Sequence, residues 1–150
     1  MNDSQRAQGI HCAGLALALP YSWARSVVDD FAISAVPNAP AWLVGAANVE
    51  GRIVAVVDLH AWAEPAAPQQ PPARQRLLLG GDGSDAFALR FEGLPALLHN
   101  VPPGQAALGS LPAALQPFVR GAAQAHDNAP LWPVLDIQGL ADTWAAELAA

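Results

Sequence analysis

The chain has 150 residues, of which 53% are hydrophobic and 13% charged, and its formal net charge is −6. This composition predicts one globular domain with a sizeable core and argues against disorder. The chain contains no lysine, and such an acidic surface is a poor match for phosphate backbones, which argues against nucleic-acid binding. Its lone cysteine, Cys12, excludes an intrachain disulfide and fits a reducing compartment. No apolar run approaches the roughly 20 residues of a transmembrane helix, so we expect a soluble, cytoplasmic protein.

The first third of the chain predicts short strands. Residues 1–9 are polar and are expected to be frayed. Leucines and alanines alternate over residues 14–19, which is typical of a half-buried strand. Further strands are expected over residues 23–28 and 31–34, and the prolines of residues 37–40 indicate a loop.

One pattern occurs twice in the chain. Residues 45–59 read Gly-Ala-Ala-Asn, a turn, an apolar strand and Asp58, and residues 121–137 read Gly-Ala-Ala-Gln, a longer turn, an apolar strand and Asp136. Two such units predict two similar β-halves rather than a long repeat array. An aspartate at a strand end commonly caps the next turn, so we expect Asp58 and Asp136 to be caps rather than acid–base catalysts.

The remaining elements are predicted from composition and periodicity. Residues 60–64 indicate a helical turn, and the Pro/Gln-rich residues 65–73 an exposed linker. The second half is expected to hold strands, a Gly-rich hairpin turn, a loop with a helical turn near Leu115, and a terminal helix. Their ranges are 77–79, 86–92 and 94–98 for strands, 80–83 for the hairpin turn, 102–112 for the loop and 140–148 for the helix.

Candidate chemistry is sparse. The histidines lack metal-ligand spacing, no Gly-x-Ser-x-Gly elbow is present, and residues 80–83 lack the Lys-Ser/Thr ending of a phosphate loop. We therefore expect no catalytic, cofactor-binding or metal-binding residues. Trp132 and Trp144 are expected in the core, whereas Trp42 and Trp62 are expected to be partly exposed, where an aromatic ring serves either packing or an interface.

Residues 36–59 resemble the central signature of CheW-like domains, the adaptors of bacterial chemosensory arrays. That signature runs Pro–x–x–Pro, then Gly-apolar-x-Asn-x-Arg-Gly, then an apolar strand ending in Asp-Leu. Residues 90–94 and 131–137 resemble the family's second-half strands, and the likeness spans about residues 14–149. The Trp- and Ala-rich composition resembles adaptors of type IV pilus or twitching-motility systems at least as much as flagellar ones.

The resemblance implies a mainly all-β fold of two five-stranded, SH3-like barrels with short helices and a C-terminal helix. In a single domain, 1–150, we expect the first barrel at about 14–75, the second at 76–139 and the helix at 140–149. The implied function is to couple a sensor histidine kinase to the cytoplasmic tips of chemoreceptors, without catalysis or cofactor, at membrane receptor arrays. The residues expected to contact these partners are Val27, Val28, Trp42, Gly45, Asn48, Glu50 and Arg52.

The chain departs from the family pattern at two positions. Glu50 stands where the family usually has arginine, and Ala55 where it usually has proline. Arg52 points to the same side of an extended chain as residue 50 and is a candidate substitute. The alternatives to an adaptor are a small-ligand-binding β-barrel, which would need a deep enclosed pocket, and an enzyme, which would need convergent polar groups in a cleft.

Overall fold

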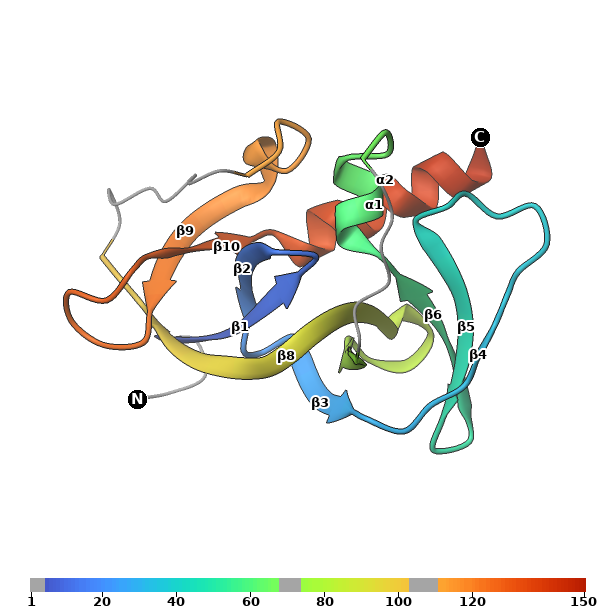
Figure 1. The fold of residues 1–150 in the computed structure, drawn as a ribbon, viewed down its shortest axis with the longest axis horizontal. Helices are drawn as coiled ribbons and strands as arrows, with labels where there is room; N and C mark the ends of the chain where they lie inside the picture. The colour runs from blue at the N-terminus through green and yellow to red at the C-terminus, as the bar shows by residue number, and fades with distance from the viewer. Residues whose placement is uncertain (1–4, 68–73, 103–110) are drawn as a thin grey trace.

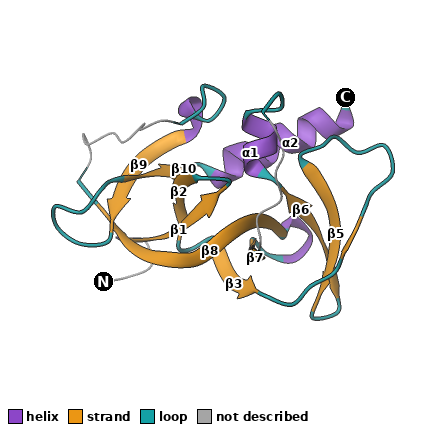
Figure 2. Cartoon of the chain, viewed as in Figure 1, coloured by secondary structure: helices purple, strands orange, loops and turns teal. Residues whose placement is uncertain are grey.

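The computed structural model describes residues 5–67, 74–102 and 111–150. These residues form mostly β-structure with two α-helices (Figure 2), which confirms the predicted fold class. The strands are β1 (Arg6–Cys12), β2 (Leu15–Pro20), β3 (Ala24–Val28), β4 (Ile33–Ser34), β5 (Leu43–Val49), β6 (Arg52–Val57), β7 (Gln75–Gly80), β8 (Phe87–Asn100), β9 (Val119–Gln124) and β10 (Trp132–Leu135). The helices are α1 (Leu59–Ala63) and α2 (Ile137–Ala149), with short 3₁₀ turns η2 (Gly83–Asp85) and η3 (Gln116–Phe118).

One barrel closes through strands from both ends of the chain. β1 pairs antiparallel with β2 and with the second half of β8, and β9 pairs with β8 and β10. The parallel pairing of β10 with β2, at Val134 and Ala18, closes the ring. A closed ring leaves no strand edge for accidental pairing.

The other barrel is built from the middle of the chain. Its strands follow the order β3, β7, the first half of β8, β6, β5 and β4. β3 and β4 end this order, and among the described pairings neither joins the other, so this middle barrel is open and contains six strands where five were expected. In Figure 1, β8 crosses the molecule from β9 to β6, so this single strand belongs to both barrels.

The barrels do not divide at residue 75 as the sequence predicts. β1 and β2 lie with β9 and β10, whereas β3 to β7 form the middle barrel. The physical reason is the parallel β2–β10 contact, because parallel strands need a long crossover and here most of the chain supplies it. β1 also begins at Arg6, inside the stretch predicted to be frayed, since two neighbouring strands bond to it.

The internal repeat is a hairpin followed by a capped helix, once in each barrel. In the first copy β5 and β6 lead to Asp58, whose carboxylate accepts a hydrogen bond of 3.0 Å from the Ala61 amide. In the second copy β9 and β10 lead to Asp136, whose carboxylate accepts from the Gly139 amide at 3.0 Å. The capping prediction is confirmed, and the cap explains why α2 begins at Ile137 rather than at residue 140.

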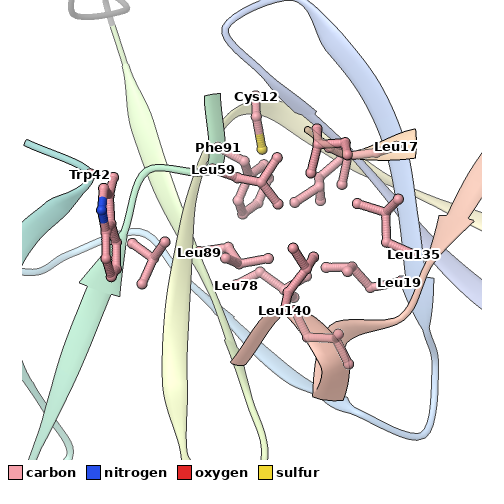
Figure 3. Close-up of a cluster of buried hydrophobic side chains, with 14 of the residues drawn as sticks. Cys12, Leu17, Leu19, Trp42, Leu59, Leu78, Leu89, Phe91, Leu135 and Leu140 are labelled. Atoms are coloured by element: carbon pink, nitrogen blue, oxygen red, sulfur yellow. The ribbon is translucent and has the colours of Figure 1, made fainter. Parts of the chain in front are cut away.

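A shared hydrophobic core joins the barrels and helices. Figure 3 shows Leu17, Leu19 and Leu135 of one barrel facing Leu78 and Leu89 of the other. Leu59 of α1 and Leu140 of α2 complete this cluster, and both are fully buried. Smaller clusters fill each barrel, one around Val54 and Val56 and one around Ala18 and Leu98.

One tryptophan, Trp42, is placed differently from the expectation. Trp42 is buried at 8% exposure, and its ring centroid lies 6.0 Å from that of Trp144. The prediction that Trp42 is partly exposed is therefore wrong. The Trp42 carbonyl accepts a hydrogen bond of 2.8 Å from the amide of Asp58, the N-cap of α1, and this bond holds Trp42 next to the start of that helix. Trp62 is partly exposed as predicted. Leu148 of α2 follows the buried Leu140 and Trp144 at intervals of four residues, yet it is 50% exposed.

The other predicted turns are largely found. A hairpin turn containing η2 joins β7 to β8, and η3 follows Leu115. Residues 87–100 form one long strand where two were expected, with Gly93 at a positive φ of 75° inside it. The predicted linker and loop lie partly outside the described residues, at 68–73 and 103–110.

Candidate partner-binding surface

The β5–β6 hairpin turn carries the candidate residue in which the chain departs from the family pattern. Glu50 and Gly51 have φ values of 53° and 84°, and Val49 pairs with Arg52 across them. Two successive positive φ values fit a tight two-residue hairpin loop, a type I′ geometry that favours Asn or Gly. The Asn48 side chain accepts from the Gly51 amide at 3.0 Å. Asn48 therefore stabilises the turn, and Glu50 is presented at its exposed tip.

Arg52 connects this turn to its neighbour. Its guanidinium donates to the Gly83 carbonyl at 2.8 Å, in the β7–β8 turn. Arg25 of β3 holds the same turn through Asp82 at 2.9 Å. Arg52 is exposed, but its hydrogen-bonding capacity is partly used within the chain, so it is not a simple replacement for the family's arginine at position 50.

The predicted residues of β3 lie on an open strand. Val27 is 38% exposed and pairs with Leu78, while Val28 packs partly against the core of the middle barrel. Since β3 ends the strand order of this barrel, its outer edge is available for pairing or packing with another protein. Gly45, by contrast, is buried beneath β4, where an added Cβ would lie 2.4 Å from the Ser34 carbonyl oxygen.

The structure thus separates the predicted residues into three groups. Asn48, Glu50 and Arg52 share one exposed hairpin turn, and Val27 and Val28 lie on β3. Trp42 and Gly45 are buried, so their immediate roles are packing and close strand approach. Partner contact by any of these residues stays a prediction.

Sequence reasoning missed a groove between α2 and the middle barrel. Its volume is about 830 Å³, and it lies among the start of β3, the β7–β8 turn, the end of β6, the end of β10 and one face of α2. The face of α2 carries Ala141, Ala145 and the half-exposed Leu148. Leu148 is exposed although it continues the apolar stripe of Leu140 and Trp144, and it lines the groove. The sequence alone does not show which other segments line the groove opposite α2.

Aromatic rings line the groove and continue into the core. Trp23 lies 5.2 Å from Phe87, and Phe87 lies 5.7 Å from Trp144, measured between ring centroids. Trp144 also contacts Trp42 and Trp62, each at 6.0 Å. The helices are joined at this point, since the Trp62 indole donates to Glu147 at 2.7 Å and α1 lies beside α2 (Figure 2).

The charges on the groove are mainly acidic. Asp82 and Asp136 pair with Arg25 and Arg120, at 2.9 and 3.3 Å. Asp85 and Asp142 also line the groove, and neither forms an ion pair with a described residue. Asp142 accepts a hydrogen bond from the neutral Gln138 side chain at 3.0 Å.

The described residues contain no group of three His, Cys, Asp or Glu side chains that could hold a metal ion. Cys12 is buried, and desolvation raises the pKa of its thiol, with further increases from the Asp58 and Glu92 carboxylates and partial opposition from Arg90. Such a thiol is a poor nucleophile because the thiolate is disfavoured. No helix within the described segments is long and apolar enough to cross a membrane.

Comparison with known protein families identifies the family of this chain. The sequence model of the CheW-like domain matches residues 7–143. The chain belongs to the CheW-like domain family. The fold agrees with a crystal structure described as the scaffolding protein TtCheW from Thermoanaerobacter tengcongensis, with a TM-score of 0.63 and 18% sequence identity over 89% of each chain. None of the curated proteins compared with the chain matches it.

Proposed function

We propose that this CheW-like protein is a non-catalytic adaptor that couples chemoreceptors to a sensor histidine kinase in a bacterial chemosensory pathway. The observation that carries the proposal is the family match over residues 7–143, together with the likeness of the fold to a solved structure described as a CheW scaffolding protein. Cys12, the chain's lone thiol, is buried and is therefore poorly placed to act as a nucleophile. As an adaptor of this kind it would act in the cytoplasm, at receptor arrays, in a chemotaxis or twitching-motility system.

In this proposal one surface of the protein binds the kinase and another binds the receptor. The open edge of β3 and the Glu50 turn on the middle barrel suit a kinase regulatory domain of related β-barrel fold, because unpaired edges accept further strands and side chains. The groove beside α2 suits the helical tip of a receptor. A small-ligand-binding barrel is less well supported, since side chains of the core clusters fill the barrels and the groove lies between elements.

The adaptor proposal predicts a ternary complex. We expect the purified chain to bind a receptor cytoplasmic tip fragment and a kinase regulatory domain from the same bacterium at the same time. Sedimentation velocity measures this directly, and the kinase domain should sediment with the receptor fragment only when the chain is present. Binding of the chain to neither protein, with a folded control spectrum, would overturn the proposed function.

Glu50 is expected to set the choice of kinase. Glu50→Arg should change the ratio of affinities for two regulatory domains by about tenfold, or about 1.4 kcal/mol. One domain is the cognate partner, and the other comes from a system whose adaptor has the usual arginine. Charge reversal at an interface acts through complementarity, and the change should shrink with added salt if the turn lies at an exposed rim.

The matched variant is Glu50→Gln, which removes the charge but keeps a non-glycine residue at the positive φ of 53°. It separates the electrostatic effect from any change in the hairpin turn. Titrations at two ionic strengths measure both ratios. An unchanged ratio for Glu50→Arg would assign Glu50 to the solvated turn alone.

A further inference from the structure

We infer that the groove beside α2 selects an amphipathic helix whose apolar stripe is flanked by basic residues, and that Asp85 and Asp142 make this selection. The inference rests on the proposed docking of a receptor helix in the groove and specifies the chemistry of that helix. Neither acidic residue was among the candidates that the sequence indicated.

The shape of the groove favours a helix. Ala141 and Ala145 are spaced by four residues and therefore share one face of α2, with Leu148 on the next turn. Small side chains on one helix allow the backbone of a second helix to approach, because the interaxial distance depends on the side chains at the contact. The space of about 830 Å³ lies along this face rather than inside a barrel.

The lining supplies apolar contact area for such a helix. Trp23 and Phe87 are only partly buried, and they face the groove from the middle barrel. Aromatic rings bury large areas and anchor interfaces well when they are desolvated. Leu148, at 50% exposure, offers a further apolar contact from α2.

The charge pattern selects among helices. Arg25 and Arg120 are each already paired with an aspartate of the groove. Asp85 of the β7–β8 turn and Asp142 of α2 line the groove from two different elements, and neither forms an ion pair with a described residue. Arg52 donates to the Gly83 carbonyl of the same turn but does not line the groove. The net charge of −6 on the whole chain reinforces this field. Lysine or arginine beside the apolar stripe of a partner helix would complement it, whereas glutamate would meet like charge.

The test compares two synthetic helical peptides that share one apolar face and carry either lysine or glutamate on the flanks. Calorimetric titration at low salt should show at least tenfold tighter binding of the lysine peptide. The double variant D85N/D142N should reduce this preference at least threefold, and added salt should reduce it as well. Asp127→Asn is the matched control, because Asp127 is also exposed but does not line the groove.

A second variant locates the binding. Ala145→Glu places a bulky charge on an exposed position of α2 and should abolish binding of the lysine peptide without disturbing the core. Equal affinities for the two peptides, or no effect of Ala145→Glu, would overturn the inference. If a receptor tip fragment binds wild type and D85N/D142N equally, the charge inference fails while the adaptor function stands. If neither receptor nor kinase fragments bind, the proposed function itself fails, whatever the peptides do.

Discussion

Replacing Asp58 with alanine is expected to lower the free energy of unfolding by about 3 kcal/mol, whereas replacing Asp136 lowers it by about 1 kcal/mol. Both aspartates hold the same place in the repeat and cap the following helix at 3.0 Å. Asp58, however, also pairs with Arg90, and the two side chains are only 11% and 22% exposed. Its loss leaves the Arg90 charge largely desolvated and unpaired.

Asp136 provides the internal control for this experiment. Its pairing with Arg120 is 3.3 Å long, and the side chains are 29% and 58% exposed, so solvent screens most of that interaction. Asp58→Asn is the second control, because the amide oxygen retains an acceptor for the Ala61 amide while removing the charge. Urea unfolding with equal m-values measures the losses. Equal losses for Asp58→Ala and Asp136→Ala would show that the ion pair beneath α1 contributes little.

Substitution of the two repeat glycines, Gly45 and Gly121, is also expected to change the free energy of unfolding by different amounts. Gly45→Ala should lower the free energy of unfolding by about 2 kcal/mol, which is typical of overpacking. A Cβ at Gly45 would lie 2.4 Å from the Ser34 carbonyl oxygen and 2.7 Å from the Ile33 side chain, and the backbone there has a φ of 156°. Ser34 belongs to β4, which pairs with β5 only through Ile33 and Ser34, so moving β4 to relieve the clash would break the pairing that holds it.

Gly121→Ala tests the same substitution at the equivalent place in the second copy. No atom lies within 4 Å of a Cβ built there, and alanine is generally favoured over glycine inside a strand by about 0.5–1 kcal/mol. This variant should therefore be neutral or slightly more stable in thermal unfolding. If Gly45→Ala is tolerated equally well, β4 is not held by close contact with β5. Because β4 ends the middle barrel, displacement of β4 should also weaken the binding of a kinase domain in the adaptor proposal.

The sequence predicted local features wherever a short segment determines its own structure. The alternation of residues 14–19 predicted β2, and the repeated strand-then-aspartate pattern predicted both helix caps. The signature of residues 36–59 indicated the family that the match over residues 7–143 establishes. These features depend on periodicity of two, on turn residues and on capping chemistry, all of which act over a few residues.

The tertiary structure decided what depends on distant segments. A parallel contact between β2 and β10 placed the ends of the chain in one barrel, which no local pattern encodes. The same contact network buried Trp42 against Trp144, about a hundred positions further along the chain, and left Leu148 exposed. The groove, with Asp85 and Asp142 on it, is lined by α2 and the β7–β8 turn, which lie far apart in the sequence. The sequence by itself therefore determined the family and the repeating hairpin-and-cap unit. Burial and charge pairing require the folded chain, and they decided which copy of each repeated residue is buried or paired and which is exposed.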